Sequence, residues 1–142
     1  MRARLNQNFL EHYLELDRAC CEKFGVVAGG VTEYINRLNN ARFAPGRDNV
    51  LPRLVKYRNI RNKFSHEAGA LRSCTELERA DVRWLRAFSR DLDRKKDPLS
   101  LYLRRARRYA RRRRTRKYTL IGAAFLALVI AVAVLVLWYL SH

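Results

Sequence analysis

Apolar residues recur at intervals of three and four along most of the chain, which is the spacing of one buried face on an α-helix. The first such stretch runs from about residue 5 to residue 24, with apolar positions at Phe9, Tyr13, Leu16, Cys20 and Phe24. Gly25 and the pair Gly29-Gly30 are expected to end it. The pattern resumes over about residues 31–41, which predicts a second helix.

A third predicted helix begins near residue 49 and fades near residue 69. A start at this point leaves Pro52 in the first turn, where a missing backbone N–H breaks no helical hydrogen bond. A fourth helix is expected to open with a capping box, because Thr75 is followed three residues later by Glu78. Its apolar stripe consists of Leu77, Trp84, Leu85, Phe88 and Leu92.

The last predicted helix starts at Asp97-Pro98, an N-cap residue followed by proline at the first helical position. It continues through an arginine-rich stretch into residues 120–140, a run of 21 residues without a charge. At 1.5 Å per residue this segment is roughly 32 Å long and matches a hydrocarbon core of about 30 Å. Tyr118 before it and Trp138 with Tyr139 at its end are typical of membrane interfaces. The alternative, a buried core helix, is disfavoured because so small a domain could not cover it on all sides.

These helices predict an all-α fold in three parts, since alternating β-branched runs are absent outside the apolar segment. We expect a small four-helix domain over residues 1–97, a basic juxtamembrane helix over 98–117 and a transmembrane helix over 118–140. The polar start of the chain lacks the apolar stretch of a signal peptide. The sequence therefore predicts a single-pass, tail-anchored membrane protein.

Positive charge is concentrated directly before the apolar segment. The net charge is +17, and ten basic residues without an acidic one lie between positions 104 and 117. Such a run predicts a cytoplasmic N-terminal domain. It is also expected to bind anionic lipid head groups, with each residue contributing on the order of 1 kcal/mol. The run consists of Arg104, Arg105, Arg107, Arg108, Arg111, Arg112, Arg113, Arg114, Arg116 and Lys117. A further interpretation is an RNA funnel, with Tyr102 and Tyr109 available for stacking.

The three cysteines, Cys20, Cys21 and Cys74, form no CxxC motif and have no metal-ligand spacing. We expect them to be small apolar core groups in a reducing cytoplasm. Carboxylate or histidine clusters with ligand spacing are also absent from the sequence. The sequence therefore predicts neither a metal site nor a cofactor. His12, on the flank of the first helix, is expected to be a surface or boundary residue rather than a catalytic one.

One face of the third predicted helix starts apolar and turns polar. Its apolar members are Leu51, Leu54 and Val55, and its polar members are Arg58, Arg61, Asn62, Ser65 and His66. A different side carries Tyr57, Ile60 and Phe64, which can anchor this half of the helix to the core. The pattern therefore presents the polar groups to a ligand. Asn62 and His66 are four residues apart, close enough for the amide to orient the imidazole.

Residues 61–66, Arg-Asn-Lys-Phe-Ser-His, form an R-N-x-x-x-H string on this helix, preceded by Leu51-x-x-Leu54-Val55. At this point the chain resembles the HEPN families (higher eukaryotes and prokaryotes nucleotide-binding), over roughly residues 5–95. The resemblance implies a small helical bundle that, in many members, cleaves RNA without a metal ion. By it, Arg61, Asn62 and His66 are the active-site set, and two copies pair so that both motifs line one cleft. It also implies a role in bacterial phage defence or as a toxin.

The residue types suit this chemistry. Cleavage of RNA by its own 2′-hydroxyl needs a group that titrates near neutral pH, which His66 supplies. It also needs a fixed positive group on the phosphate, which is the strength of arginine. Lys56, Arg58 and Lys63 are expected to contact the RNA backbone without reading its sequence. The alternative interpretation of the same residues is a solvated helix end.

We therefore expect a membrane-tethered, metal-independent HEPN-type endoribonuclease that acts on single-stranded RNA as a homodimer or higher oligomer. Its expected partners are RNA, a membrane with anionic lipids and a second copy of the chain, while a partner protein from a defence system is left open. The alternative is a non-catalytic HEPN-fold sensor or oligomerisation module whose assembled transmembrane helices perturb the membrane. Ala123, Ala127 and Ala131, spaced four apart, are compatible with such helix association.

Overall fold

The computed structural model describes residues 2–141, apart from the side chains of residues 113–117 and 133. Within these residues there are six helices and no strand, so the all-α prediction is confirmed. The helices are α1 (Arg2–Phe24), α2 (Gly30–Asn40), α3 (Arg47–His66), α4 (Ala70–Ser73), α5 (Arg79–Asp93) and α6 (Pro98–Leu140). The chain forms two compact units, residues 1–103 and residues 104–142.

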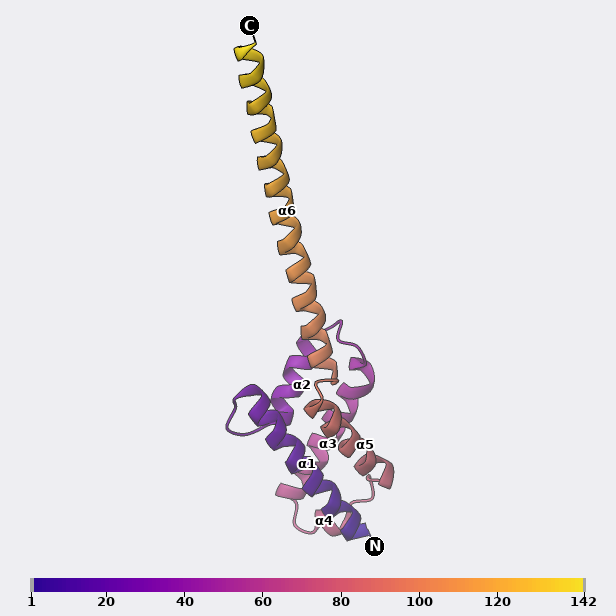
Figure 1. Ribbon diagram of the computed structural model, residues 1–142. Coiled ribbons are helices and arrows are strands. Elements are labelled where there is room, and N and C mark those ends of the chain that lie inside the picture. Colours follow the sequence, from indigo (N-terminus) through magenta and orange to yellow (C-terminus); the bar gives the residue numbers. More distant parts are fainter. Residues whose placement is uncertain (1, 142) are drawn as a thin grey trace. The chain divides into compact units, whose positions relative to one another are not determined.

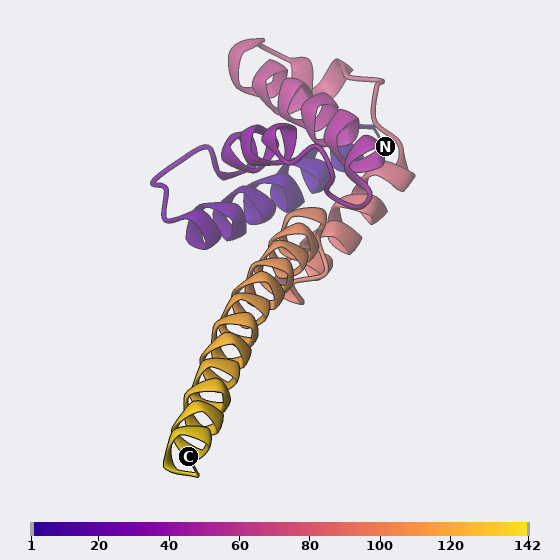
Figure 2. The same ribbon diagram turned by 90° about the horizontal axis from the view of Figure 1, so that it is seen from above.

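Helix α1 lies at the centre of the first unit, where it contacts α2, α5, α4 and α3. Figures 1 and 2 show α1 and α2 side by side, joined by a short loop. As predicted, glycines end the first helix: Gly25 and Gly29 have φ angles of 68° and 71°, in the left-handed region that favours glycine. Gly30, however, is not part of the break, because it is the first residue of α2.

Gly30 allows α2 to lie directly on the backbone of α1. A Cβ atom at this position would stand 2.2 Å from the carbonyl oxygen of Asp17 and 2.4 Å from the amide nitrogen of Cys21. Both are backbone atoms of α1, so they cannot move aside without distorting that helix. Asp17 also fixes the start of α2, because its Oδ1 accepts a hydrogen bond from the Val31 N–H at 2.8 Å.

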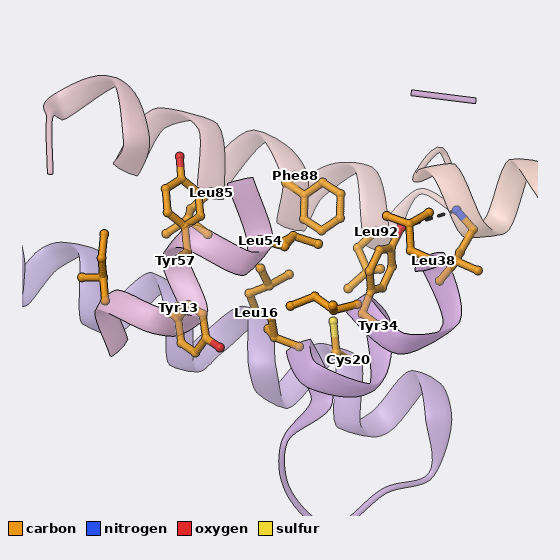
Figure 3. Packing of buried hydrophobic residues seen from close by; sticks show 14 of the residues in the cluster. Tyr13, Leu16, Cys20, Tyr34, Leu38, Leu54, Tyr57, Leu85, Phe88 and Leu92 are labelled. Atoms are coloured by element: carbon orange, nitrogen blue, oxygen red, sulfur yellow. Dashed lines mark hydrogen bonds between the residues drawn. The ribbon is translucent and has the colours of Figure 1, made fainter. Parts of the chain in front are cut away.

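The apolar faces of α1, α2, α3 and α5 converge on one core (Figure 3). Its largest fully buried side chains include Phe9, Leu16, Tyr34, Leu38, Leu54, Tyr57, Ile60 and Leu85. Aromatic rings link the helices edge to face, with centroids 5.4 Å apart for Phe9 and Tyr57 and 5.5 Å apart for Tyr57 and Trp84. Cys20 lies in this core, as predicted, and burial raises the pKa of its thiol to about 12.

Helix α3 begins two residues earlier than the sequence predicts. Gly46, with a φ of 74°, is its N-cap, and its carbonyl accepts hydrogen bonds from Asn49 and Val50. Pro52 is therefore inside the helix, and its expected place in the first turn is wrong. The helix tolerates it there at the expense of one hydrogen bond, because proline has no N–H to give to the carbonyl four residues before.

The segment between α3 and α5 also differs from the prediction. The sequence did not indicate α4, which lies beside the N-terminal end of α1 (Figure 1). The buried amide of Asn6 holds this segment by donating to the carbonyls of Leu71 and Cys74 at 3.0 Å each. Because α4 has four residues and is held by a side chain far away in the sequence, it shows no apolar periodicity from which a helix could be predicted.

The expected capping box of Thr75 with Glu78 is wrong, because α5 begins at Arg79 and Glu78 is its N-cap. The box is formed three residues later, where the Glu78 N–H donates to Asp81 Oδ2 at 2.8 Å. Asp81 is also the acceptor for the Tyr57 hydroxyl of α3 at 2.8 Å. Its tertiary contact therefore favours the later start.

The start of α6 is built on a buried carboxylate, that of Asp97, which is 1% exposed. As predicted, Asp97 caps α6, with Oδ2 accepting the Ser100 N–H at 3.2 Å. The Tyr34 hydroxyl donates to the same oxygen at 2.8 Å, and Lys23 Nζ donates to Oδ1 at 2.9 Å. Burial on its own would raise the pKa of Asp97, but hydrogen bonds from Ser100, Lys23 and Tyr34 outweigh it and hold the pKa below its usual value.

In the remainder of α6, the stretch Tyr118–Leu140 is long and apolar enough to cross a membrane. The described side chains of this stretch are exposed. The predicted C-terminal apolar helix is therefore confirmed in its length and composition.

Replacing Asp97 with alanine should destabilise the helical domain. The substitution removes the cap of α6, leaves the Tyr34 hydroxyl without its acceptor and leaves Lys23 with Ser100 Oγ but no carboxylate, so we expect the free energy of unfolding to fall by about 3 kcal/mol. Denaturation of the full chain in detergent, followed by Trp84 fluorescence in a Trp138→Phe background, measures this change. The matched Asp93→Ala change, at an exposed carboxylate of α5, should alter the free energy by less than about 0.5 kcal/mol.

The same carboxylate gives a defined pH dependence. Because its folded-state pKa lies below the ordinary value of 3.8, the stabilisation is fully present above that value and is lost as the pH falls through the folded-state pKa. The wild-type chain should therefore lose more stability between pH 5 and pH 2 than Asp97→Asn does. Parallel curves for the two proteins would contradict this assignment.

Gly30→Ala should destabilise the packing of α1 on α2. The added methyl group meets backbone atoms on α1, so we expect a loss of about 2 to 3 kcal/mol in the same denaturation experiment. Gly122→Ala is the matched control, because a Cβ at that helical glycine meets no atom within 4 Å. Equal unfolding curves for the two variants would show that the close approach is unimportant.

Candidate functional site

Helix α3 has one covered side and one open side, as its sequence predicts. Tyr57 and Ile60 are 1% exposed, and Phe64 packs on Phe9 with ring centroids 6.3 Å apart. The open side consists of Arg58, Arg61, Asn62, Ser65 and His66, which we call the α3 polar arc. The two arginines are half-buried and the other three residues are exposed.

The arginines of the α3 polar arc lie at its margin with α1. Burial, and then the carboxylate of Asp17, raise the pKa of the Tyr13 hydroxyl on α1, while the positive charges of Arg61 and Arg58 act in the opposite direction. Both guanidinium groups are therefore within electrostatic range of this hydroxyl. Arg61 Nη1 also donates to Asn62 Oδ1 at 3.3 Å. Arg61 is thus supported by its neighbours rather than fully solvated.

His66 lies at the other margin, in the last residue of α3. Its ring is exposed and has no hydrogen-bond partner among residues 2–141. The four-residue spacing suggested that the Asn62 amide orients His66, but no hydrogen bond between the two is among the contacts of the described residues, and the Asn62 oxygen accepts from Arg61. Ser65 turns back onto the helix, donating to the carbonyl of Arg61 at 3.3 Å. His66 is therefore accessible but not positioned within one chain.

Arg61 and His66 point in different directions. Residues five apart on an α-helix are separated by roughly 140° around its axis. The structure accordingly places Arg61 on the side near Tyr13, while His66 is fully at the surface. One copy of α3 therefore does not aim both groups at a single phosphate.

The two lysines expected to bind RNA are in surface ion pairs. Lys56 Nζ is 3.6 Å from Asp81 Oδ1, and Lys63 Nζ is hydrogen-bonded to Glu76 at 2.5 Å. That hydrogen bond from Lys63 to Glu76 raises the pKa of the lysine. Exposed pairs of this kind stabilise a fold by little, so a phosphate can displace them at small cost. Arg58 completes the predicted set at the margin near α1.

The basic run lies on α6. Its described side chains, those of Arg104, Arg105, Arg107, Arg108, Arg111 and Arg112, are exposed. The expected lipid contacts of Arg113, Arg114, Arg116 and Lys117 fall on side chains that lie outside the described residues. The exposed arginines provide the concentrated positive surface that anionic head groups require.

His12 forms a second histidine site, which the sequence pattern did not indicate. His12, on α1, is a boundary residue as expected, with a side chain 22% exposed, but it is held on both sides. Its Nδ1 is 2.9 Å from Glu15 Oε2, and its Nε2 accepts a hydrogen bond from Arg86 Nε on α5 at 2.7 Å. The spacing of His12 and Glu15 was visible in the sequence. The contact with Arg86 was not, because it depends on the packing of α5 against α1.

In the part of the chain that the structure describes, no group of three or more His, Cys, Asp or Glu side chains is placed to hold a metal ion. The cysteines are free thiols, with Cys20 buried and both Cys21 and Cys74 partly exposed.

A family model described as "Family of unknown function (DUF6548)" matches residues 7–123. The match runs from α1 through the basic run and ends inside the apolar stretch of α6. No curated protein and no solved structure matches the chain.

Proposed function

We propose that this chain, which belongs to the DUF6548 family, is a membrane-tethered HEPN-type endoribonuclease. It cleaves single-stranded RNA without a metal ion, at a site shared by two copies of α3. The observation that carries this proposal is the α3 polar arc, a row of half-buried arginines and exposed asparagine, serine and histidine on a helix whose other side buries Leu54, Tyr57 and Ile60. The resemblance of residues 61–66 to the HEPN motif and the all-helical domain support it.

The two margins of the α3 polar arc fit two chemical tasks. Arg61, supported by Asn62, can hold the phosphate and stabilise the charge that develops on it. The unpartnered imidazole of His66 can accept the proton of the RNA 2′-hydroxyl as that oxygen attacks the phosphorus. The P–O5′ bond breaks, and the leaving oxygen takes a proton from water. The products are a 2′,3′-cyclic phosphate and a 5′-hydroxyl.

A second copy resolves the divergence of Arg61 and His66. In a two-fold symmetric pair the same surface faces itself, so a contact between Arg61 of one copy and His66 of the other would occur twice. Such a pair contains two equivalent sites. The half-buried arginine at one margin and the solvated histidine at the other are compatible with this exchange.

The stretch Tyr118–Leu140 is the proposed tether, with the helical domain on the cytoplasmic side of the membrane. The basic run directly before this stretch favours that orientation and adds attraction to anionic lipids. The described side chains of the stretch are exposed, which leaves its surface available to lipid.

The purified full chain in detergent should cleave a fluorescent single-stranded RNA in the presence of EDTA. His66→Ala and Arg61→Ala should each lower the cleavage rate by about 100-fold or more, because each removes a group that acts only as the reaction proceeds. Arg72→Ala, at an exposed arginine of α4, is the matched control and should cleave at the wild-type rate. Cleavage that survives the Arg61→Ala/His66→Ala double substitution would end the nuclease proposal.

Mixing the two inactive variants tests the shared site. If Arg61 and His66 act across copies, an equimolar mixture forms some mixed pairs in which one of the two sites is intact, so about a quarter of the wild-type activity should return. No recovery, with exchange of subunits verified, would place both groups in one copy.

A second function is favoured by the uncovered apolar helix itself: a non-catalytic assembly module whose gathered helices perturb the membrane. Ala123, Ala127 and Ala131 recur along that helix and would allow close helix contact. Under this function, dye release from liposomes of anionic lipid should require residues 118–140 and should persist in His66→Ala. Replacing residues 118–140 with an unrelated apolar anchor of equal length is the control. Equal release by both anchors would exclude this function.

A further inference from the structure

A groove separates the exposed edges of α1 and α5 in the first unit. It begins as a hollow of about 650 Å³, whose apolar lining is provided by Leu5 and Val82. A second hollow of about 590 Å³ lies further along the same two helices, and Arg86 lines both. We call the two hollows together the α1–α5 groove. Its arginines are Arg2, Arg4, Arg79, Arg83, Arg86 and Arg90.

The groove forms because two polar stripes face each other. On α5, Arg79, Arg83, Arg86 and Arg90 follow the spacing of one helical face, beside the buried face of Val82, Leu85, Phe88 and Leu92. On α1, Arg4, Asn8 and His12 recur every four residues. The packing of α1 against α5 brings the two stripes together.

The positive charge in the groove is nearly uncompensated. Among the lining residues, Glu15 is the one carboxylate beside six arginines. Like charges three and four residues apart on a helix destabilise it by a few tenths of a kcal/mol per pair. This arrangement differs from that of Lys56 and Lys63, which the fold pairs with acids. A bound polyanion would relieve the repulsion that the fold leaves in place.

Arg86, at the junction of the two hollows, is held in position for binding. Its Nε donates to His12 Nε2 at 2.7 Å and its Nη2 donates to Asn8 Oδ1 at 3.4 Å. Acceptance at Nε2 requires the neutral imidazole with its proton on Nδ1, where Glu15 Oε2 lies at 2.9 Å. The Nη1 group of Arg86 has no partner within residues 2–141. The guanidinium is thus ordered in advance, with donors left for a ligand.

We propose that the α1–α5 groove binds the phosphate backbone of single-stranded RNA and so holds the substrate; this rests on the proposed function. A polymer fits better than a single nucleotide, because Arg79 and Arg90 are roughly 16 Å apart along α5 and the hollows adjoin. No aromatic side chain lines either hollow, so the contacts are electrostatic and independent of base sequence.

Position within the domain favours RNA over lipid head groups. The first hollow lies at the N-terminal end of α1, where Arg2 and Arg4 line it. Asp97, from which α6 departs, contacts Lys23 at the other end of α1. These ends are roughly 30 Å apart along the helix. The first hollow therefore lies far from the point where the chain leaves the domain toward the apolar segment, while the second hollow, lined by Glu15 and Arg90, extends the groove toward that point.

The test compares two double variants of the full chain in micelles of neutral detergent. Arg79→Gln/Arg83→Gln removes one charge from each hollow, and both side chains are exposed, so the fold should be retained. Arg42→Gln/Arg72→Gln removes the same charge from exposed positions elsewhere. The probe is a fluorescent single-stranded 2′-O-methyl RNA, which has no free 2′-hydroxyl and cannot be cleaved. Its dissociation constant is measured by anisotropy at several salt concentrations, and thermal unfolding checks that both variants fold.

The groove variant should bind the probe at least 10-fold more weakly than wild type. Loss of two phosphate contacts should also reduce the slope of log K against log salt by about 1.4. The control variant should stay within about twofold of wild type. Equal affinities and slopes for the two double variants, arising from binding at the basic run alone, would overturn the proposal. Two further results for the groove variant would also overturn it. Unchanged RNA affinity with weaker binding to anionic liposomes would assign the groove to lipid, and unchanged RNA affinity with a lower dimer fraction would assign it to self-association.

The outcomes for the groove and for the nuclease are separable. His66→Ala should keep the wild-type affinity for the 2′-O-methyl probe, whereas the groove variant should show a higher KM for RNA cleavage with a kcat near that of wild type. A chain that binds RNA through the groove but never cleaves it would refute the nuclease and leave the groove assignment standing. RNA cleavage with equal KM in both double variants would refute the groove assignment and leave the nuclease proposal standing.

Discussion

The buried carboxylate of Asp97 is the contact on which the arrangement of the first unit depends most. Removing a lone carboxylate from water costs several kcal/mol, and here donors from three helices offset that cost: Lys23 on α1, Tyr34 on α2 and the first turn of α6. The Tyr34 hydroxyl also accepts the Leu99 N–H at 3.4 Å, so the same network fixes the residue after the proline. Residues 98–103 are thus joined to the domain by directional bonds, and not by apolar contact alone.

The sequence predicts those elements whose pattern is local. Helix α5 was recognisable because Leu85, Phe88 and Leu92 mark a continuous stripe, and the cap at Asp97 because proline follows it. By contrast, α4 depends on Asn6 of α1, and the start of α5 on the contact of Asp81 with Tyr57. The α3 polar arc was predicted by helical spacing. The assignment of Arg61 and His66 to one face was too coarse, because residues five apart are separated by roughly 140° around a helix and in the structure they occupy opposite margins of the arc.

The fold treats its positive charges in two ways. Lys56 and Lys63 each have a carboxylate partner, as a charge with a structural or neutral role commonly does. Beside the arginine stripe of α5, the one carboxylate among the residues that line the two hollows is that of Glu15, and its partner is His12. Arg86 also joins α5 to α1 through His12 and Asn8, but the repulsion along the stripe lowers stability, and a ligand that the charges attract would offset it. Under the two proposals, the surface that binds RNA and the surface that cleaves it are different parts of one small domain, the α1–α5 groove and the α3 polar arc.

The divergence of Arg61 and His66 also gives the tether a physical purpose under the proposed function. A site completed only by a second copy is inactive wherever the domains are dilute and associate weakly. Anchoring through Tyr118–Leu140 confines the domains to one plane and raises their effective concentration, which drives pairing without any new contact. The anchor would thereby control activity as well as location. The family match, over residues 7–123, covers the helical domain and the basic run and ends a few residues into the apolar stretch.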